Sequence, residues 1–259
     1  MHPRIDFFIA GVQKGGTTAL DALLRSHPRI QMARVKEIHF FDNEGMDWQS
    51  PDLAPLHQEF DWETENVQRG EATPIYTYWR NALRRLKVYN PSARVLMVLR
   101  HPSFRAYSHW RMEVSRKAET LSFDDAISIG RDRVSGAPYG QHRVFSYVER
   151  GYFEHQIAEL QELFPPQQVH FLRTDSLWNN PDVELARIER FLGVENLVSA
   201  RRSYIAPLKS MNTAAMSKHA RGLLDEIFEP TIAVLGQLTG LEFDDWQRSD
   251  YVEPMVAND

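Results

Sequence analysis

A glycine-rich segment with one lysine follows the first apolar run of the chain. Residues 7–11 read Phe-Phe-Ile-Ala-Gly, and Lys14, Gly15, Gly16, Thr17 and Thr18 come shortly after. A turn of this kind between a strand and a helix offers backbone N–H groups, a helix N-terminus and a cation to an oxyanion. The pattern predicts a P-loop-like loop that binds phosphate. The alternative is a glycine-rich turn with a solvated lysine.

The order of the residues in this loop separates it from the loop of most ATPases. In a Walker A sequence, the lysine follows the last glycine and precedes Ser or Thr. Here Lys14 precedes both Gly15 and Gly16, so its side chain leaves the loop from a different place. This order favours a nucleotide chemistry other than ordinary ATP hydrolysis.

An arginine follows the strongest later apolar run. Residues 95–99 read Val-Leu-Met-Val-Leu, Arg100 comes next, and Ser108 lies in a helix predicted to begin near Pro102. Guanidinium binds phosphate through two hydrogen bonds, and a hydroxyl group adds another. Arg100 and Ser108 therefore suit a terminal phosphate. The alternative is an arginine at a strand end and a serine on a solvated helix face.

A carboxylate and an imidazole stand two residues apart in the segment Val35–Asp42. Glu37 and His39 would share one face of this segment if it is extended. Apolar neighbours would partly desolvate Glu37, which suits a general base. The alternative is a surface charge pair beside a core Phe-Phe. In the segment Gly70–Tyr76, a loop could present Tyr76 to a ligand, or Pro74 could simply end a strand.

Apolar runs and helical spacing alternate along the chain. Such alternation predicts an α/β fold, with a central parallel sheet flanked by helices and ligands at the carboxyl ends of the strands. We expect a single domain over residues 1–259, because no linker-like stretch divides the chain. The expected strands are residues 5–10, 68–76, 94–99 and 169–172, with a short strand or turn at 38–41. The expected helices are residues 17–26, 78–89, 101–117, 123–129, 153–163, 183–192 and 220–238, with loop at 46–66.

Composition limits the partners. The net charge of −5 gives no general attraction to nucleic acid or to an anionic membrane, so local lysines and arginines must hold any anion. The chain has no cysteine, which excludes a thiolate nucleophile and a cysteine-ligated zinc. No stretch resembles a signal peptide or a membrane span, so the expected location is the cytoplasm. The oligomeric state is not indicated.

The four segments together resemble the sulfotransferases that use 3′-phosphoadenosine 5′-phosphosulfate (PAPS). The likeness is closer to the heparan sulfate sulfotransferases and their bacterial relatives than to the cytosolic steroid and phenol enzymes. It rests on Gly11–Thr18, Lys36–Asp42, Gly70–Tyr76 and the run from Leu99 to Ser108. A weaker likeness continues to Trp246.

The resemblance implies which residues hold the cofactor. It implies that Lys14–Thr18 bind the 5′-phosphosulfate, and that Arg100 and Ser108 bind the 3′-phosphate. The family usually closes a late loop over that phosphate. Candidates for this loop are Lys209 and Asn212, with Lys218 and Arg221 as rivals.

The resemblance also implies a reaction, the in-line transfer of a sulfuryl group to an acceptor hydroxyl, which leaves 3′-phosphoadenosine 5′-phosphate (PAP). The family's proposed base corresponds to Glu37. His39 could orient Glu37, contact the sulfuryl group, or be the base itself. Lys14 and the loop amides would neutralise the leaving phosphate oxygen, so that no metal is required.

The acceptor is less constrained. The heparan sulfate branch often has a substrate-contacting lysine where this chain has Ala72, and the chain is acidic overall. We therefore expect a small or lipid- or polyketide-like hydroxyl acceptor, with Glu37, His39 and Tyr76 at its site. Aromatic residues in the variable stretches agree with a partly apolar acceptor. Two other functions stay open: a P-loop-type nucleotide kinase, and a non-catalytic nucleotide-binding module.

Overall fold

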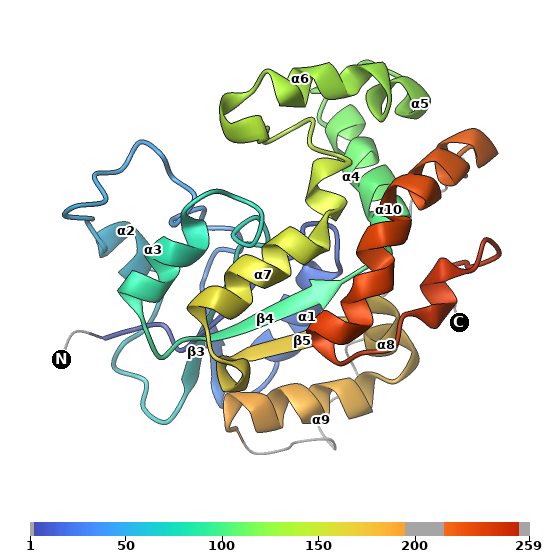
Figure 1. The fold of residues 1–259 in the computed structure, drawn as a ribbon. Helices are drawn as coiled ribbons and strands as arrows, with labels where there is room; N and C mark the ends of the chain where they lie inside the picture. The colour runs from blue at the N-terminus through green and yellow to red at the C-terminus, as the bar shows by residue number, and fades with distance from the viewer. Residues whose placement is uncertain (1–2, 195–214, 254–259) are drawn as a thin grey trace. The chain divides into compact units, whose positions relative to one another are not determined.

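Five short strands form one parallel sheet in the order β2-β3-β1-β4-β5. Figure 1 labels β3, β4 and β5 of this sheet. The structure is a computed structural model that describes residues 3–194 and 215–253. All five residues of β1 are buried, as expected for a central strand that is covered on both faces. The strands are β1 Phe7–Gly11, β2 Ile30–Met32, β3 Gln68–Ala72, β4 Arg94–Leu99 and β5 Val169–Arg173.

The chain divides into two compact units. Of the described residues, the first contains 3–99 and 159–194, and the second contains 100–158 and 215–253. The sheet belongs to the first unit, together with helices α1 Thr17–Arg25, α2 Ala54–His57, α3 Ala82–Tyr89, α8 Thr174–Asn179 and α9 Pro181–Leu192. That the whole chain is one domain stays a prediction.

Alternate side chains of β1 pack on opposite faces of the sheet, because neighbouring residues of a strand point to opposite sides. Phe7 and Ile9 belong to a buried apolar cluster with residues of α1, α8 and α9. On the other face, Phe8 makes edge-to-face contacts with Phe41 and with Tyr89 of α3, at ring-centroid distances of 5.6 and 6.3 Å. Helices therefore flank the parallel sheet, which confirms the predicted fold class.

The connections change direction at β1. The chain passes from β3, which pairs with one edge of β1, to β4, which pairs with the other edge. A crevice forms where neighbouring parallel strands continue to opposite sides, and ligands of α/β proteins bind there, outside the carboxyl ends of the strands. The loop that follows β1 lies at this position, so the fold places Lys14–Thr18 where a ligand is expected.

The second unit is mainly helical. It contains α4 Pro102–Ser115, α5 Phe123–Ala126, α6 Asp132–Ser135 and α10 Lys218–Thr239, and helix α7 Phe153–Leu163 runs across its boundary with the first unit. The Ser103 hydroxyl on α4 donates to the Asp225 carboxylate on α10 at 2.8 Å.

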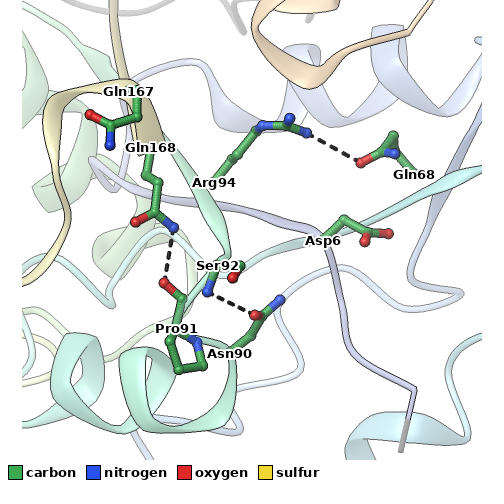
Figure 2. A pocket seen from close by; sticks show the side chains of 8 residues that line it. All are labelled: Asp6, Gln68, Asn90, Pro91, Ser92, Arg94, Gln167 and Gln168. Atoms are coloured by element: carbon green, nitrogen blue, oxygen red, sulfur yellow. Dashed lines mark hydrogen bonds between the residues drawn. The ribbon is translucent and has the colours of Figure 1, made fainter. Parts of the chain in front are cut away.

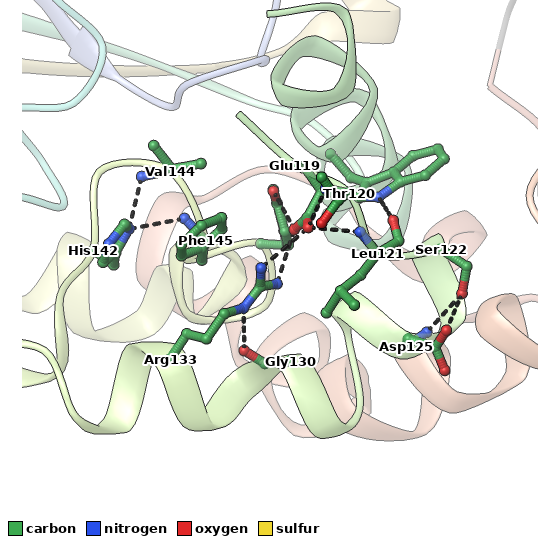
Figure 3. A network of polar contacts seen from close by, with 12 residues as sticks. Glu119, Thr120, Leu121, Ser122, Asp125, Gly130, Arg133, His142, Val144 and Phe145 are labelled. Carbon is green, nitrogen blue, oxygen red and sulfur yellow. Dashed lines mark hydrogen bonds and ion pairs between the residues drawn. The ribbon is translucent and has the colours of Figure 1, made fainter. Parts of the chain in front are cut away.

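The segment between α4 and α7 is organised around one buried carboxylate, Glu119 (Figure 3). Arg133 donates to both of its oxygens at 2.8 and 3.1 Å, and the Tyr147 hydroxyl donates at 2.9 Å. Burial raises the pKa of Glu119, but the bond from Arg133 and the other hydrogen bonds outweigh it and lower the pKa to about 2. The hydrogen bonds to this carboxylate therefore hold the largely irregular segment together.

One local expectation differs from the structure, because strand β2 was not expected. Of the strand or turn expected at residues 38–41, no strand forms, and residues 46–66 are mostly loop as expected, with the short helix α2 among them. The other predicted strands and helices recur with shifts of a few residues at their ends, except that residues 123–129 give only the four-residue helix α5 and a 3-10 turn beginning at Ile129. Within the described residues, no helix combines the length and apolar character needed to cross a membrane.

Candidate active site

The predicted phosphate loop connects the buried strand β1 to α1. Gly16 is the residue before the first turn of α1. Gly16 has a φ of 93°, a left-handed conformation that is natural for glycine, and no side chain caps this helix end. The first N–H groups of α1 are therefore left for an anion, which also meets the positive end of the helix dipole.

Gly15 packs so tightly against β4 that a larger residue would not fit. A Cβ atom added at Gly15 would lie 2.5 Å from the carbonyl oxygen of Val98 and 2.8 Å from that of Val12. The Val12 N–H itself donates to the Val98 carbonyl oxygen at 3.0 Å. Lys14 has a φ of 68°, so left-handed residues stand on both sides of Gly15 and curve the backbone into the loop.

Thr174, at the start of α8, holds the loop from the adjacent strand end. Its hydroxyl donates to the carbonyl oxygen of Gly15 and, at 3.0 Å, contacts that of Leu99, the last residue of β4. Sequence reasoning missed this residue, because 159 positions separate it from Gly15. Its place directly after β5 was the available signal, since parallel strands end at one edge of the sheet.

The structure brings Glu37 and His39 together, although not by an extended strand. Both have left-handed backbones, with φ values of 64° and 56°. The Oε2 atom of Glu37 lies 3.9 Å from Nε2 of His39, and both side chains are partly accessible to solvent. Non-glycine residues in this conformation are strained, and such residues cluster at functional sites. The pair therefore has the chemistry and the accessibility of an acid–base site.

Two charged residues that sequence reasoning did not assign a role flank this pair. Asp42, completely buried, contacts Nδ1 of His39 through Oδ2 at 2.9 Å and so fixes the imidazole ring. The Nζ atom of Lys36 donates to Oε1 of Glu37 at 2.6 Å. Burial raises the pKa of Asp21 on α1, and the charges of Arg25 and Lys36 oppose this rise, so Lys36 lies near α1 as well. Both residues stand in the Lys36–Asp42 motif, where their charge was the available signal.

Tyr76 has a different environment from the one expected. Its side chain is completely buried, and its hydroxyl oxygen accepts a hydrogen bond from the Phe40 N–H at 3.2 Å. Burial raises the pKa of Tyr76 well above its usual value. We expected Tyr76 to be presented to a ligand, but the apolar core of the Phe-Phe segment encloses the ring. The structure thus gives it the role of a scaffold for the turn that carries His39.

Backbone hydrogen bonds bring the phosphate loop, the Lys36–Asp42 motif and the Gly70–Tyr76 motif to one edge of the sheet. The Glu37 N–H donates to the carbonyl oxygen of Ala72, the last residue of β3, at 3.0 Å. The Thr77 N–H donates to the carbonyl oxygen of Ala10 in β1, also at 3.0 Å. The phosphate loop and the Glu37–His39 pair therefore belong to the carboxyl edge of the same two strands.

The motif with Arg100 and Ser108 lies in the second unit. Arg100 directly follows β4, and its guanidinium group forms two hydrogen bonds with the carboxylate of Glu253, at 2.6 and 2.7 Å. Ser108 is half-buried on α4. Arg221 is bound to Asp225, while Lys209 and Asn212 lie outside the described residues.

A polar pocket of about 460 Å³ lies at the opposite edge of the sheet (Figure 2). Gln68 and Arg94, which line it, are the first residues of β3 and β4, whereas the motifs follow the last residues of the strands. Arg94 donates to the side-chain oxygen of Gln68 at 3.5 Å and to the carbonyl oxygen of Leu192 at 2.9 Å. This pocket is thus separate from the candidate site.

The sequence profile of the sulfotransferase domain matches residues 4–227. This match covers the first unit's motifs and most of the chain. The chain belongs to the PAPS-dependent sulfotransferase family. Its sulfotransferase relatives include heparan sulfate glucosamine 3-O-sulfotransferase 3A1 of Mus musculus, which is 29% identical over 89% of this chain and 58% of that protein. Heparan sulfate glucosamine 3-O-sulfotransferase 6 of Homo sapiens is 30% identical over 78% of this chain and 56% of that protein.

Solved structures of sulfotransferases share the fold. The sulfotransferase from Alicyclobacillus acidocaldarius has a TM-score of 0.80 and 25% identity, and the match covers 95% of this chain and 100% of that chain. The sulfotransferase STF9 from Mycobacterium avium, at a TM-score of 0.58 and 12% identity, shows the fold alone over 90% of this chain and 78% of that chain. The present chain spans less than three fifths of the length of the curated relatives named above.

The residues at the carboxyl edge fit the phosphosulfate end of PAPS. The start of α1 has no side-chain cap, Gly16 before it is left-handed, and Lys14 adds a cation in the same loop. These are the donors that bind phosphate groups without a metal.

Proposed function

We propose that this chain transfers the sulfuryl group of PAPS to a hydroxyl group of an acceptor. The observation that carries the proposal is the placing of Lys14 and the Glu37–His39 pair at the carboxyl edge of β1 and β3, in a chain of the sulfotransferase family. The family supports PAPS as the sulfuryl donor, and the uncapped helix α1 supports a phosphosulfate at this edge.

Each group has a part in the proposed transfer. Glu37 takes the proton of the acceptor hydroxyl, while His39, held by Asp42, stands beside it as an orienting group or as an alternative base. Lys14 and the first N–H groups of α1 stabilise the negative charge of the leaving phosphate oxygen. When bound, PAPS supplies an activated sulfuryl group. The protein then needs only to position the reactants, neutralise the charge of the leaving group and accept a proton. Arg100 and Ser108 are proposed to hold the 3′-phosphate.

We propose a small or lipid-like hydroxyl acceptor and not a polyanion. The neutral, buried Ala72 contacts the backbone of Glu37, and the chain carries a net charge of −5. Both features disfavour a strongly acidic glycan near the base. The named relatives favour the other outcome, because their names specify heparan sulfate. The acceptor therefore has to be tested directly.

The test uses ³⁵S-labelled PAPS with three acceptors and a metabolite extract. The acceptors are an N-sulfated heparan oligosaccharide, the phenol 4-methylumbelliferone and the long-chain alcohol 1-dodecanol. Label in the phenol, the alcohol or an extracted small molecule supports the proposed acceptor class. Label only in the oligosaccharide overturns that class but keeps the transfer reaction. No label in any acceptor, despite tight PAP binding, supports the non-catalytic module.

The variant Glu37→Gln tests the base. We expect it to lose nearly all transfer while it binds PAP as the parent protein does, because the amide keeps the shape of the carboxylate but accepts no proton. Glu63→Gln, on an exposed loop, is the matched control. If Glu37→Gln keeps most of its turnover, then His39→Asn identifies the alternative base. Thermal shifts with PAP against ATP–Mg²⁺ separate a sulfotransferase from a kinase.

A further inference from the structure

A completely buried carboxyl group, that of Glu71, lies beneath the turn that carries Glu37 and His39. Glu71 is on β3, and its residue has no exposed surface. Burying a carboxyl group is costly unless hydrogen bonds compensate it. The sequence motif Gly70–Tyr76 contains Glu71, but the reaction proposed above gives it no task.

The segment 71–73 holds three consecutive N–H groups of the turn. The Glu37 N–H donates to the carbonyl oxygen of Ala72 at 3.0 Å. The Ile38 N–H donates to the Glu71 carboxyl group. The His39 N–H contacts Oγ1 of Thr73 at 3.4 Å, and the hydroxyl of Thr73 in turn donates to Oε1 of Glu71. Glu71 therefore accepts the second of these three hydrogen bonds, and through Thr73 it also supports the third.

These contacts act on strained backbone. Glu37 and His39 both have positive φ values, and each non-glycine residue in that region costs about 1 kcal/mol or more. A strained conformation persists only where surrounding contacts determine it. The N–H of Ile38, between the two strained residues, receives its partner from the side chain of Glu71 and not from a regular strand. Loss of that partner would let both reactive side chains turn away.

The charges around Glu71 come from the same turn. Burial raises the pKa of its carboxyl group to about 7, hydrogen bonds from Thr73 and Ile38 oppose this rise, Asp42 adds to it and His39 lowers it. Tyr76 also faces the group, since the charge of Glu71 contributes to its raised pKa. Within the described part of the chain, the Oε2 atom of Glu71 has no hydrogen-bond partner. A proton on this oxygen therefore relieves the buried charge without breaking the contacts of Oε1.

We propose that Glu71 is a positioning residue of the active site, which holds Glu37 and His39 in their reactive geometry through the Ile38 N–H and Thr73. The inference rests on the proposed sulfuryl transfer and adds a residue to it. Glu71 touches neither the acceptor nor the donor, so its effect falls on turnover and not on nucleotide binding.

The first test compares Glu71→Leu with Glu71→Gln at pH 6. Glutamine keeps an oxygen for Ile38 and Thr73, whereas leucine removes it. We expect Glu71→Leu to lower kcat about 100-fold, the usual cost of a misplacement of about 1 Å, with an unchanged Kd for PAP. We expect Glu71→Gln to stay within about twofold of the parent kcat, because an oxygen at the same place preserves the turn. Turnover is measured with the best acceptor of the panel above.

Glu189→Leu is the matched control for removing a buried carboxyl group. Glu189 is also buried, lies on α9 and pairs with His27. It should lower stability while leaving kcat unchanged. If Glu71→Leu does not fold, Thr73→Val tests the same contact, because it removes the hydroxyl that joins Glu71 to the turn. A parent-like kcat in folded Glu71→Leu or Thr73→Val overturns the proposal, and so does a Glu71→Gln variant as slow as the leucine variant.

A readout without turnover separates this inference from the proposed function. In amide hydrogen-exchange measurements by nuclear magnetic resonance, the Ile38 N–H should exchange faster in Glu71→Leu than in the parent or in Glu71→Gln, because leucine removes its acceptor. Glu189→Leu should leave the Ile38 exchange rate unchanged. An unchanged Ile38 exchange rate in Glu71→Leu overturns the positioning role. Faster exchange in a protein that sulfates no acceptor keeps the positioning role and overturns the proposed function alone.

Discussion

The guanidinium group of Arg100 is bound at two points by the carboxylate of Glu253. The two hydrogen bonds, at 2.6 and 2.7 Å, use the same fork of donors that guanidinium offers to a phosphate. Nearby, the ring of Tyr251 stacks on His101 at a centroid distance of 5.1 Å, and this contact holds the segment before Glu253 against the residues after β4. If Arg100 binds the 3′-phosphate of PAPS, then the Glu253 carboxylate occupies the position of that phosphate and has to leave when PAPS binds.

The first prediction follows from this competition. Glu253→Gln should bind PAP more tightly than the parent protein, because the nucleotide no longer has to displace a charged partner from Arg100. A partly exposed ion pair is worth about 1 kcal/mol, which corresponds to about a fivefold lower Kd. Isothermal titration calorimetry measures it. Asp250→Asn, which removes the exposed pair with Arg248, is the control and should leave Kd unchanged. Equal or weaker binding by Glu253→Gln would show that Arg100 and Glu253 form a structural pair.

The second prediction concerns the space at Gly15. Gly15→Ala should abolish measurable PAP binding or weaken it at least about tenfold, because the new Cβ atom would meet the carbonyl oxygens of Val98 and Val12 and displace the loop. Overpacking of this kind also costs about 1–3 kcal/mol of stability. Gly222→Ala is the control, since it adds a Cβ atom in open space on α10 and should stabilise the fold slightly. Parent-like PAP affinity in Gly15→Ala would remove the loop from the binding site.

The third prediction tests Thr174 as the support of that loop. Thr174→Val keeps the shape of the side chain but leaves the carbonyl oxygens of Gly15 and Leu99 without this donor. Loss of a hydrogen bond to a buried group costs about 1–3 kcal/mol, so urea unfolding should show lower stability and PAP should bind more weakly. Thr174→Ser keeps the hydroxyl and should restore most of both losses. A serine variant as weak as the valine variant would mean that the methyl group, and not the hydroxyl, supports the loop.

Much of the sheet could be predicted from the sequence, because its central strands are continuous apolar runs. β4 begins and ends at the predicted residues, Arg94 and Leu99. Strand β2 escaped prediction because Ile30–Met32 is too short to show a period, and it joins the sheet only by pairing with β3. Pairing between strands is a tertiary event that a local pattern does not record.

The candidate site could be predicted only in part, because some of its features depend on tertiary contacts. The type and spacing of Lys14, Glu37 and His39 identified them, since their chemistry is local to each motif. The left-handed backbones of Glu37 and His39 were not predictable, because hydrogen bonds from residues 71–73 impose them against local preference. Thr174 and Glu71 act through contacts between strand ends, which only the folded chain brings together.

The last prediction uses the titration of Glu71. Burial raises its pKa from 4.5 in an unperturbed glutamate to about 7 in the folded protein, and hydrogen bonds only partly offset this rise. Between these two values, the folded state binds more protons than the unfolded state, so the contribution of Glu71 to the free energy of unfolding falls as pH rises. The loss amounts to about 3 kcal/mol between pH 4.5 and pH 7 and changes little above pH 8.

Glu71→Gln removes this titration, so the variant should gain stability relative to the parent as pH rises. Urea unfolding at pH 5, 6, 7 and 8 measures the difference in free energy of unfolding between the two proteins. We expect that difference to move in favour of glutamine by about 2–3 kcal/mol across the series. Glu63→Gln, an exposed substitution, corrects for the change in net charge. A difference that does not vary with pH would mean that Glu71 is ionised throughout, and that the turn above it binds a carboxylate at every pH tested.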